Sequence, residues 1–348
     1  MLGCPCRPSS PTLWGGQVPD GGAGMNILIT GGCGFIGSFL AERLLGDGYG
    51  VVVLDNLSTG SLDNVAALRG RDGFSCVIGS VRDQSLVQEL VDRCDMVVHL
   101  AAAVGVKTIL DRPSHSIHTN VNGTENVLHA ASWGNKLVFI ASTSEVYGKS
   151  SRSAFREDDD LVMGSTSNLR WSYACAKALD ECLALAYTQE KRVSAIIGRL
   201  FNTTGPRQTG RYGMVLPNFV NQALMDEPIT VFGSGEQTRC FGHVNDAVES
   251  MIRLIRNPAA IGQVFNIGSE NEISIMDLAE RVKAMTDSKS EIRLIPYDRA
   301  YAYGFEDMLR RKPDVSKLER LTGYRPTTST DQIIADVIEE KKVKLGLV

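Results

Sequence analysis

The first ordered pattern in the chain is Asn26-Ile-Leu-Ile-Thr-Gly31-Gly32-Cys33-Gly34-Phe35-Ile36-Gly37. A short apolar run, a glycine-rich turn and a second apolar run predict a strand, a tight turn and the start of a helix. In such a unit Gly31 forms the turn, Gly34 lets the backbone approach a pyrophosphate, and Gly37 lets the helix pack on the strand. The helix N-terminus favours the phosphate charge. The stretch therefore predicts a dinucleotide site.

A second predicted strand, Val51-Val-Val-Leu-Asp55-Asn56, brings an acidic residue 18 positions after Gly37. At this place a carboxylate accepts hydrogen bonds from an adenosine ribose and repels a 2′-phosphate, which favours NAD over NADP. Beyond the third predicted strand, Gly79-Ser80-Val81 stands where an adenine contact is expected.

The order of the predicted elements indicates the fold class. Strands over 27–30, 51–54, 74–78, 96–100, 137–141 and 193–198 alternate with helices over 35–46, 84–91, 113–132 and 171–190. Parallel strands need crossover connections, and the helices then cover both faces of the sheet. The predicted class is therefore α/β, a doubly wound parallel Rossmann sheet.

The second half of the chain is less regular and predicts a smaller, interleaved substrate lobe. A loop over 202–213, helices over 214–225, 277–285 and 331–341, and short strands over 229–232 and 264–267 are expected. We expect a disordered leader over residues 1–24 and an NAD-binding Rossmann domain over 25–200. The rest, 201–348, is expected to form mainly the substrate lobe, with about 240–265 returning to the Rossmann domain.

Composition points to a small-molecule partner. The chain has 348 residues, with 36 Lys and Arg against 40 Asp and Glu, a net charge of −4. This balance gives no basic footprint for nucleic acid, and no apolar run is long enough to span a membrane. The eight cysteines are scattered and no secretory signal is visible, so we expect reduced thiols in the cytoplasm. No metal is expected, because Cys4 and Cys6 have no second ligand pair nearby.

Tyr173 and Lys177 are four residues apart on a predicted helix, so their side chains share one face. An ammonium beside a phenol favours the phenolate and lowers the phenol pKa from about 10 towards neutrality. Such a tyrosine can act as a general base towards a sugar hydroxyl. The preceding strand ends in Ser142-Thr143-Ser144-Glu145, at the sheet edge where open α/β sheets bind ligands.

Together these motifs resemble those of the extended short-chain dehydrogenases that modify nucleotide sugars. The resemblance runs from Met25 essentially to the C-terminus. It rests on the order of Thr30-Gly-Gly-Cys-Gly-Phe-Ile-Gly, Asp55, His99-Leu-Ala-Ala, Asn120-Val-Asn-Gly-Thr, Ser142-Thr-Ser-Glu-Val-Tyr-Gly, Tyr173-x-x-x-Lys177 and Asn202-x-x-Gly-Pro-Arg.

The resemblance implies NAD as cofactor, which oxidises carbon 4 of a hexose and later returns the hydride. Tyr173 is then the base, Lys177 holds the nicotinamide ribose, and Thr143 hydrogen-bonds the oxygen on carbon 4. Asn120 is expected to support the water network of the site. Ser80 departs from the Asp that is frequent in the family. The full set of expected cofactor contacts is Gly31, Gly34, Phe35, Ile36, Gly37, Asp55, Asn56, Ser80, Val81, Leu100, Ala101, Asn120, Tyr173 and Lys177.

Segments of the second half resemble nucleotide-sugar binding segments, so the expected partner is a UDP-linked sugar. Arg311, in Arg-Lys-Pro-Asp, stands where the resemblance implies a second arginine that binds the pyrophosphate of the substrate. Guanidinium forks match phosphate oxygens and stay charged. The expected substrate contacts are Arg170, Asn202, Arg207, Gln208, Val231, Arg239 and Arg311.

Ser144 and Glu145 distinguish between the reactions of the family. Ser-Glu, together with Arg239, resembles the UDP-glucuronate decarboxylases that form UDP-xylose, whereas 4,6-dehydratases carry Asp-Glu. Oxidation at carbon 4 makes the sugar a β-keto acid, which loses carbon dioxide while Tyr173 and Thr143 stabilise the enolate. Glu145 would position substrate or water, and Arg239 would bind diphosphate or assist protonation.

Other reactions stay open. The segments 101–107 and 210–217 also resemble bacterial 4-epimerases, so a 4-epimerase of UDP-glucuronate or UDP-glucose is the main alternative. A 4,6-dehydratase ranks below it, as does a non-catalytic NAD sensor, because such sensors commonly lack the tyrosine or the lysine. The helices over 113–132 and 171–190 resemble those that pair in the dimers of the family, so a homodimer is expected.

Overall fold

The computed structural model describes residues 24–210, 214–296 and 310–347. Nearly all of the predicted leader, residues 1–24, therefore lies outside the described residues. The centre of the fold is a seven-stranded sheet in the order β11-β6-β5-β4-β1-β2-β3, with every pairing parallel. Its strands are β1 (Asn26–Thr30), β2 (Gly50–Asp55), β3 (Phe74–Ile78), β4 (Met96–His99), β5 (Leu137–Thr143), β6 (Ser194–Leu200) and β11 (Val264–Ile267).

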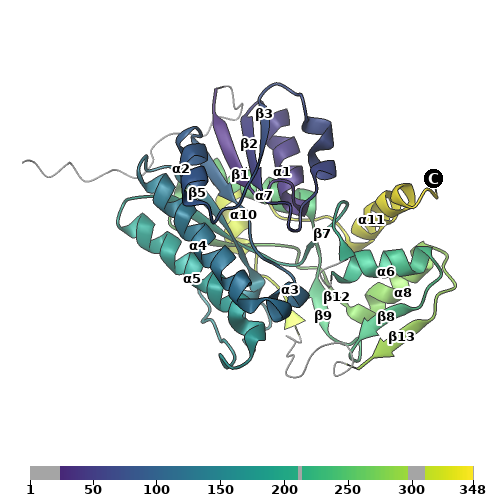
Figure 1. Ribbon diagram of the computed structural model, residues 1–348. Helices are drawn as coiled ribbons and strands as arrows, with labels where there is room; N and C mark the ends of the chain where they lie inside the picture. The colour runs from purple at the N-terminus through teal and green to yellow at the C-terminus, as the bar shows by residue number, and fades with distance from the viewer. Residues whose placement is uncertain (1–23, 211–213, 297–309, 348) are drawn as a thin grey trace, which may run out of the picture.

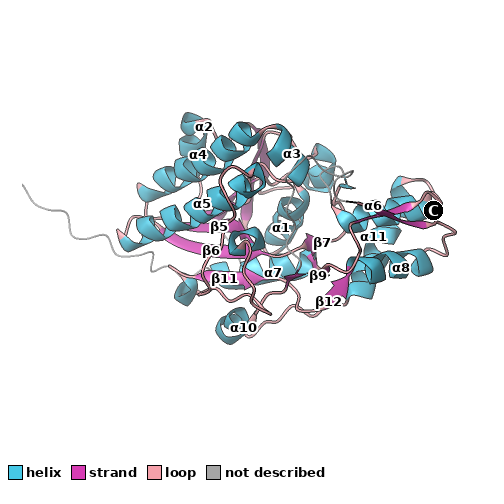
Figure 2. Ribbon diagram, turned by 90° about the horizontal axis from the view of Figure 1, so that it is seen from below, coloured by secondary structure: helices cyan, strands magenta, loops and turns pink. Residues whose placement is uncertain are grey.

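Helices cover both faces of this sheet, which confirms the predicted fold class (Figure 1). One face packs against α1 (Phe35–Gly46), α7 (Val244–Ile255) and α10 (Ser316–Thr322). The other packs against α2 (Gln84–Asp92), α4 (Pro113–Ser132) and α5 (Ser172–Gln189). Figure 2 shows the sheet between α4 and α5 on one side and α7 and α10 on the other.

Side-chain alternation explains why one strand contributes to two cores. Ile27 and Ile29 of β1 belong to the core under α1, and Leu28 belongs to the core under α4. Successive residues of a strand point to opposite faces. A parallel strand that is covered on both faces therefore reads as an unbroken apolar run.

The chain leaves the sheet after β6 and comes back to it. β11 pairs with β6 from Val264↔Ile197 to Ile267↔Leu200 and forms the sheet edge. Partly between these strands and partly after β11, the chain builds a smaller lobe with a separate core. Its elements are α6 (Val215–Leu224), β8 (Ile229–Phe232), α8 (Ile275–Met285), β13 (Ile292–Ile295) and α11 (Thr330–Lys344).

Short strands link the lobe to the sheet domain. These are β7 (Thr203–Thr204) with β10 (Gly242–His243), and β12 (Glu272–Ser274), β9 (Thr238–Cys240) and β14 (Arg310–Arg311). The segment 202–213, predicted to be rich in loop, contains β7, which was not predicted, and its residues 211–213 lie outside the described residues. A strand of two residues is too short to show a periodic pattern in the sequence. It forms because a partner strand from another part of the chain pairs with it. Three helices were also missed, namely α3 (Val106–Asp111), α7 and α10.

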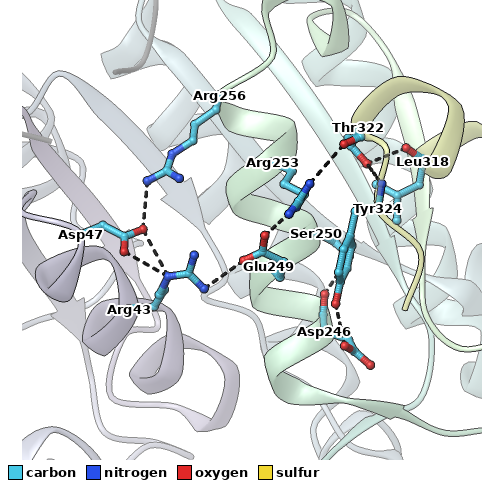
Figure 3. A network of polar contacts seen from close by, with 10 residues as sticks. All are labelled: Arg43, Asp47, Asp246, Glu249, Ser250, Arg253, Arg256, Leu318, Thr322 and Tyr324. Atoms are coloured by element: carbon cyan, nitrogen blue, oxygen red, sulfur yellow. Dashed lines mark hydrogen bonds and ion pairs between the residues drawn. The ribbon is translucent and has the colours of Figure 1, made fainter. Parts of the chain in front are cut away.

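A polar network ties α1 to α7 and to the chain after α10 (Figure 3). Arg43 on α1 lies 2.9 Å from a carboxylate oxygen of Glu249 on α7. Arg256 of the same helical region lies 2.9 Å from Asp47 at the end of α1. Tyr324 donates to Asp246 at 2.6 Å. These contacts fix the helix that begins at the glycine turn.

Candidate functional site

A cavity of about 530 Å³ lies at the carboxyl ends of the sheet strands, between the sheet and the lobe. Its walls come from the glycine turn, the ends of β2, β4 and β5, the start of α5 and the lobe. The predicted site residues that line it are Gly31, Gly34, Phe35, Ile36, Gly37, Asp55, Asn56, Val81, Leu100, Ala101, Thr143, Ser144, Glu145, Arg170, Tyr173, Asn202, Gln208, Arg239 and Arg311.

Gly31 and Gly37 of the glycine turn have no room for a side chain. Gly31 has φ +74°, and a Cβ there would lie 2.8 Å from the backbone nitrogen of Ala101. A Cβ on Gly37 would lie 2.3 Å from the Gly31 carbonyl oxygen. The bare backbone and the start of α1 therefore form a cradle of the kind that accepts a pyrophosphate.

Asp55 ends β2 at the cavity wall and is 7% exposed. Its Oδ2 accepts from the backbone N–H of Cys33 at 3.0 Å, and its Oδ1 accepts from that of Leu57 at 2.8 Å. Burial raises the pKa of Asp55, and these backbone donors oppose the rise. A carboxylate held in this position can accept hydrogen bonds from the two hydroxyls of an adenosine ribose. Asp55 and the glycine turn therefore fit NAD.

Tyr173 lies in the first turn of α5 and points its hydroxyl at Thr143 from the end of β5. Burial raises the pKa of Tyr173, as do the charges of Glu145 and Asp180, and the Thr143 hydrogen bond opposes this only in part. The expectation that Lys177 brings this pKa towards neutrality was therefore wrong for the structure. Burial is the largest cause, and the negative charges of Glu145 and Asp180 follow it.

Lys177 is 2% exposed and does not line the cavity. Its Nζ donates to Oδ2 of Asp180 at 2.8 Å, and Asp180 is fully buried. Asp180 was not predicted from the sequence. Its spacing was a usable signal, because positions 173, 177 and 180 follow the i, i+4, i+7 pattern of one helix face.

Glu145 stands between two arginines that come from distant parts of the chain. Arg170 Nη1 forms a short ion pair with its Oε2, and Arg311 Nη1 lies 3.3 Å from its Oε1. Burial raises the pKa of Glu145, but the two guanidinium charges outweigh burial and the pKa falls. Glu145 is therefore an anion, and it forms ion pairs with both arginines.

Three other predicted residues lie on the same cavity. Ser144 is 2% exposed and precedes Glu145. Arg239 projects from β9, and its Nη1 donates to the Thr238 carbonyl at 2.8 Å. Asn202 follows β6 on the lobe side.

Other predicted residues lie outside the cavity wall. Asn120 is buried on α4, and its Oδ1 accepts from the backbone N–H of Ala103 at 2.7 Å, so it holds the loop that lines the site. Val231 is fully buried in the lobe core. Ser80 accepts from the backbone N–H of Arg82 within a turn.

Arg207 is also not brought into the cavity. Its Nη2 lies 2.8 Å from Glu42, and its guanidinium stacks 4.4 Å from the ring centre of Phe39, both on α1. Its charge is thus used to attach the lobe to the sheet domain. By contrast, His115 and Thr119 of α4 line the cavity and were not predicted.

Within the residues that the structure describes, no group of three His, Cys, Asp or Glu could hold a metal ion. Among the same residues, no helix has the length and apolar character required to cross a bilayer.

Comparison with known proteins agrees with the geometry. A family model described as GDP-mannose 4,6-dehydratase matches residues 28–337. A UDP-N-acetyl-α-D-glucosaminuronate decarboxylase of Bacillus cytotoxicus is 43% identical, over 90% of this chain and 96% of that protein. UDP-glucuronic acid decarboxylase 1 of Danio rerio is 33% identical, over 90% of this chain and 72% of that protein.

A solved structure shares the whole architecture. It is UDP-glucuronic acid 4-epimerase from Bacillus cereus in complex with UDP-glucuronic acid and NAD. It is 28% identical with a TM-score of 0.82, over 92% of this chain and all of that one.

Proposed function

Because the chain belongs to the GDP-mannose 4,6-dehydratase family of extended short-chain dehydrogenases, we propose that it is an NAD-dependent decarboxylase of a UDP-linked hexuronate. The product is the UDP-linked pentose, UDP-xylose from UDP-glucuronate. The 43% identity to a decarboxylase of the 2-acetamido sugar supports UDP-N-acetylglucosaminuronate as a further substrate.

NAD supplies the hydride acceptor for carbon 4 and the donor for its later reduction. Tyr173 accepts the proton of the carbon 4 hydroxyl, and the Thr143 hydroxyl hydrogen-bonds the same oxygen. The bond from carbon 5 to the carboxylate then breaks, and its electron pair moves into the new carbonyl. Tyr173 and Thr143 stabilise the enolate oxygen, since donors aimed at developing charge lower the barrier. Carbon dioxide leaves and carbon 5 takes a proton.

One observation favours decarboxylation over epimerisation, namely that Glu145 pairs with both Arg170 and Arg311. An epimerase must keep the substrate carboxylate, and paired cations stabilise a carboxylate against loss of carbon dioxide. Here the charge of the two arginines is already shared with Glu145. The uronate carboxylate therefore meets a weaker positive field, which favours its release.

The 4-epimerase is the second candidate, since the structure with a TM-score of 0.82 carries that activity. The test incubates the full chain with NAD and either UDP-glucuronate or UDP-N-acetylglucosaminuronate, and identifies the products by NMR. The proposal expects a UDP-pentose, and Tyr173→Phe abolishes its formation. A product that is inverted at carbon 4 and keeps its carboxylate would establish the epimerase instead.

We also place the enzyme in the cytoplasm, since the six cysteines among the described residues are free thiols, as in a reducing compartment.

We propose a homodimer through α4 and α5. The outer face of α5 exposes Cys175, Leu179 and Cys182, which are one or two turns apart and carry no charge. Leu179 is 52% exposed, and Ile117 on the adjacent α4 is 37% exposed. Uncharged helix faces of this kind mark protein interfaces. Light scattering should give twice the chain mass, and Leu179→Arg should give the monomer; a wild-type monomer would refute the dimer.

A further inference from the structure

Lys177 and Asp180 form a buried ion pair on α5, the helix that also carries Tyr173. Both residues are on α5, and their side chains are 2% and 0% exposed. The Nζ to Oδ2 distance is 2.8 Å. A buried ammonium without an anion would be strongly destabilised, so this carboxylate fixes where the ammonium lies.

The surroundings of the pair are otherwise neutral or already paired. His99 on β4 has its pKa lowered to about 3, by burial and then by the charge of Lys177, so it is uncharged. Its Nδ1 lies 2.7 Å from the Thr30 hydroxyl, and its Nε2 lies 3.2 Å from the Thr124 hydroxyl. The next acid on α5, Glu181, pairs with Arg199 at 2.8 Å. Asp180 is thus the anion that faces Lys177.

Asp180 also acts on Tyr173, which lies on the same helix face two turns earlier. Its negative charge is one of the causes that raise the pKa of Tyr173. The sign follows from electrostatics, since an anion nearby disfavours the phenolate and a cation favours it. The charged groups that face the tyrosine and lysine from the packed elements are Glu145 of η2 (Ser144–Tyr147), Arg170 of η3 (Leu169–Trp171), and Asp180 on α5.

We propose that Asp180 is a positioning residue, which holds the Lys177 ammonium in place and offsets its charge on the helix face that carries Tyr173. Tyr173 then ionises at a higher pH than it would beside Lys177 alone. This rests on the proposed role of Tyr173 as the base. The consequence is a site whose tyrosine stays a neutral phenol at rest. A neutral phenol can hydrogen-bond an incoming hydroxyl, but it must lose its proton to solvent before it can accept that of the carbon 4 hydroxyl. The phenol that this transfer forms is the proton donor when the sugar is reduced again.

The test follows the ionisation of Tyr173 directly, by NMR of the protein labelled with ¹³C at the tyrosine Cζ. Tyr173→Phe assigns the signal. In the complex with NAD, the midpoint of the Tyr173 titration should be lower in Asp180→Asn by about half a pH unit or more. Asp180→Glu keeps the charge and should stay near the wild-type midpoint. An unchanged or higher midpoint in Asp180→Asn would overturn the proposal.

Turnover gives a second readout. Because activity rises as Tyr173 loses its proton, the acid limb of the kcat/KM profile should move to lower pH in Asp180→Asn, by the same amount as the NMR midpoint. A purely structural role would lower activity without moving the limb. If Tyr173→Phe retains turnover, the proposed function fails, whereas the NMR midpoint still tests Asp180.

The wild-type protein provides a measurement that does not depend on a variant folding. Without NAD, its Tyr173 signal should keep the chemical shift of the phenol at pH 9. A phenolate shift already at pH 8 would overturn the role of Asp180.

Discussion

At the scale of single residues, the reactivity of the site depends on which charged side chains form ion pairs with one another. Tyr173, Thr143 and Glu145 follow short motifs and line the cavity as predicted. The partners of Glu145 could not be predicted, because Arg311 lies 166 residues further along the chain. Arg207 was predicted to contact the substrate, but it forms an ion pair with Glu42, which lies 165 residues away in the sequence. A single sequence shows local spacing and does not show which distant charges pair.

Glu145→Gln tests the role of the arginine pairing. The neutral amide no longer offsets Arg170 and Arg311, so their charge can pair with the carboxylate of the substrate and hold it. The rate of carbon dioxide release should fall by about 100-fold, and the substrate KM should fall or stay constant. Glu270→Gln, which removes a surface pair with Arg325, is the matched control and should retain the wild-type rate. A Glu145→Gln variant with wild-type decarboxylation would contradict this role.

At the scale of elements, most of the long helices were predicted from their period, but α7, which has 12 residues, was missed, and so were the very short strands. The helix predicted over 35–46 is α1, and that predicted over 171–190 is α5 within one residue at each end. Each buries a continuous face, so its period is visible in the sequence. The two-residue strands β7, β10 and β14 depend on partners elsewhere in the chain.

Two glycines of α1 give a matched pair of variants. A Cβ on Gly37 would meet the Gly31 carbonyl oxygen at 2.3 Å, whereas a Cβ on Gly46 has nothing within 4 Å. Gly37→Ala must push the helix from the strand and should raise the Kd for NAD tenfold or more, about 1.4 kcal/mol. Gly46→Ala should leave it unchanged. Calorimetric titration with NAD measures both, and equal Kd values would show that the contact at Gly37 does not shape the cradle.

At the scale of the whole molecule, β11 joins two segments that lie far from it in the sequence, the one after β5 and the one before α10. Asn266 on β11 is fully buried and accepts from the Tyr147 hydroxyl at 2.6 Å. Its Nδ2 donates to the carbonyls of Phe155 at 2.8 Å and Asp314 at 3.1 Å. The return of this strand was predicted, and its linking role was not.

Asn266→Ala should remove these three hydrogen bonds and lower the free energy of unfolding by about 2–3 kcal/mol. Denaturant unfolding followed by circular dichroism measures the change. Asn271→Ala is the control, because Asn271 is exposed and should change stability by less than about 0.5 kcal/mol. Equal stability of the two variants would show that Asn266 does not link the two segments.

The central claim is that this cavity removes the carboxylate of a UDP-hexuronate. The most direct measurement follows a substrate labelled with ¹³C at the carboxyl carbon, incubated with the full chain and NAD, by ¹³C NMR. The label should appear as carbon dioxide and bicarbonate at the rate at which the UDP-pentose forms. A label that stays bonded to the sugar, in a product inverted at carbon 4, would contradict the claim.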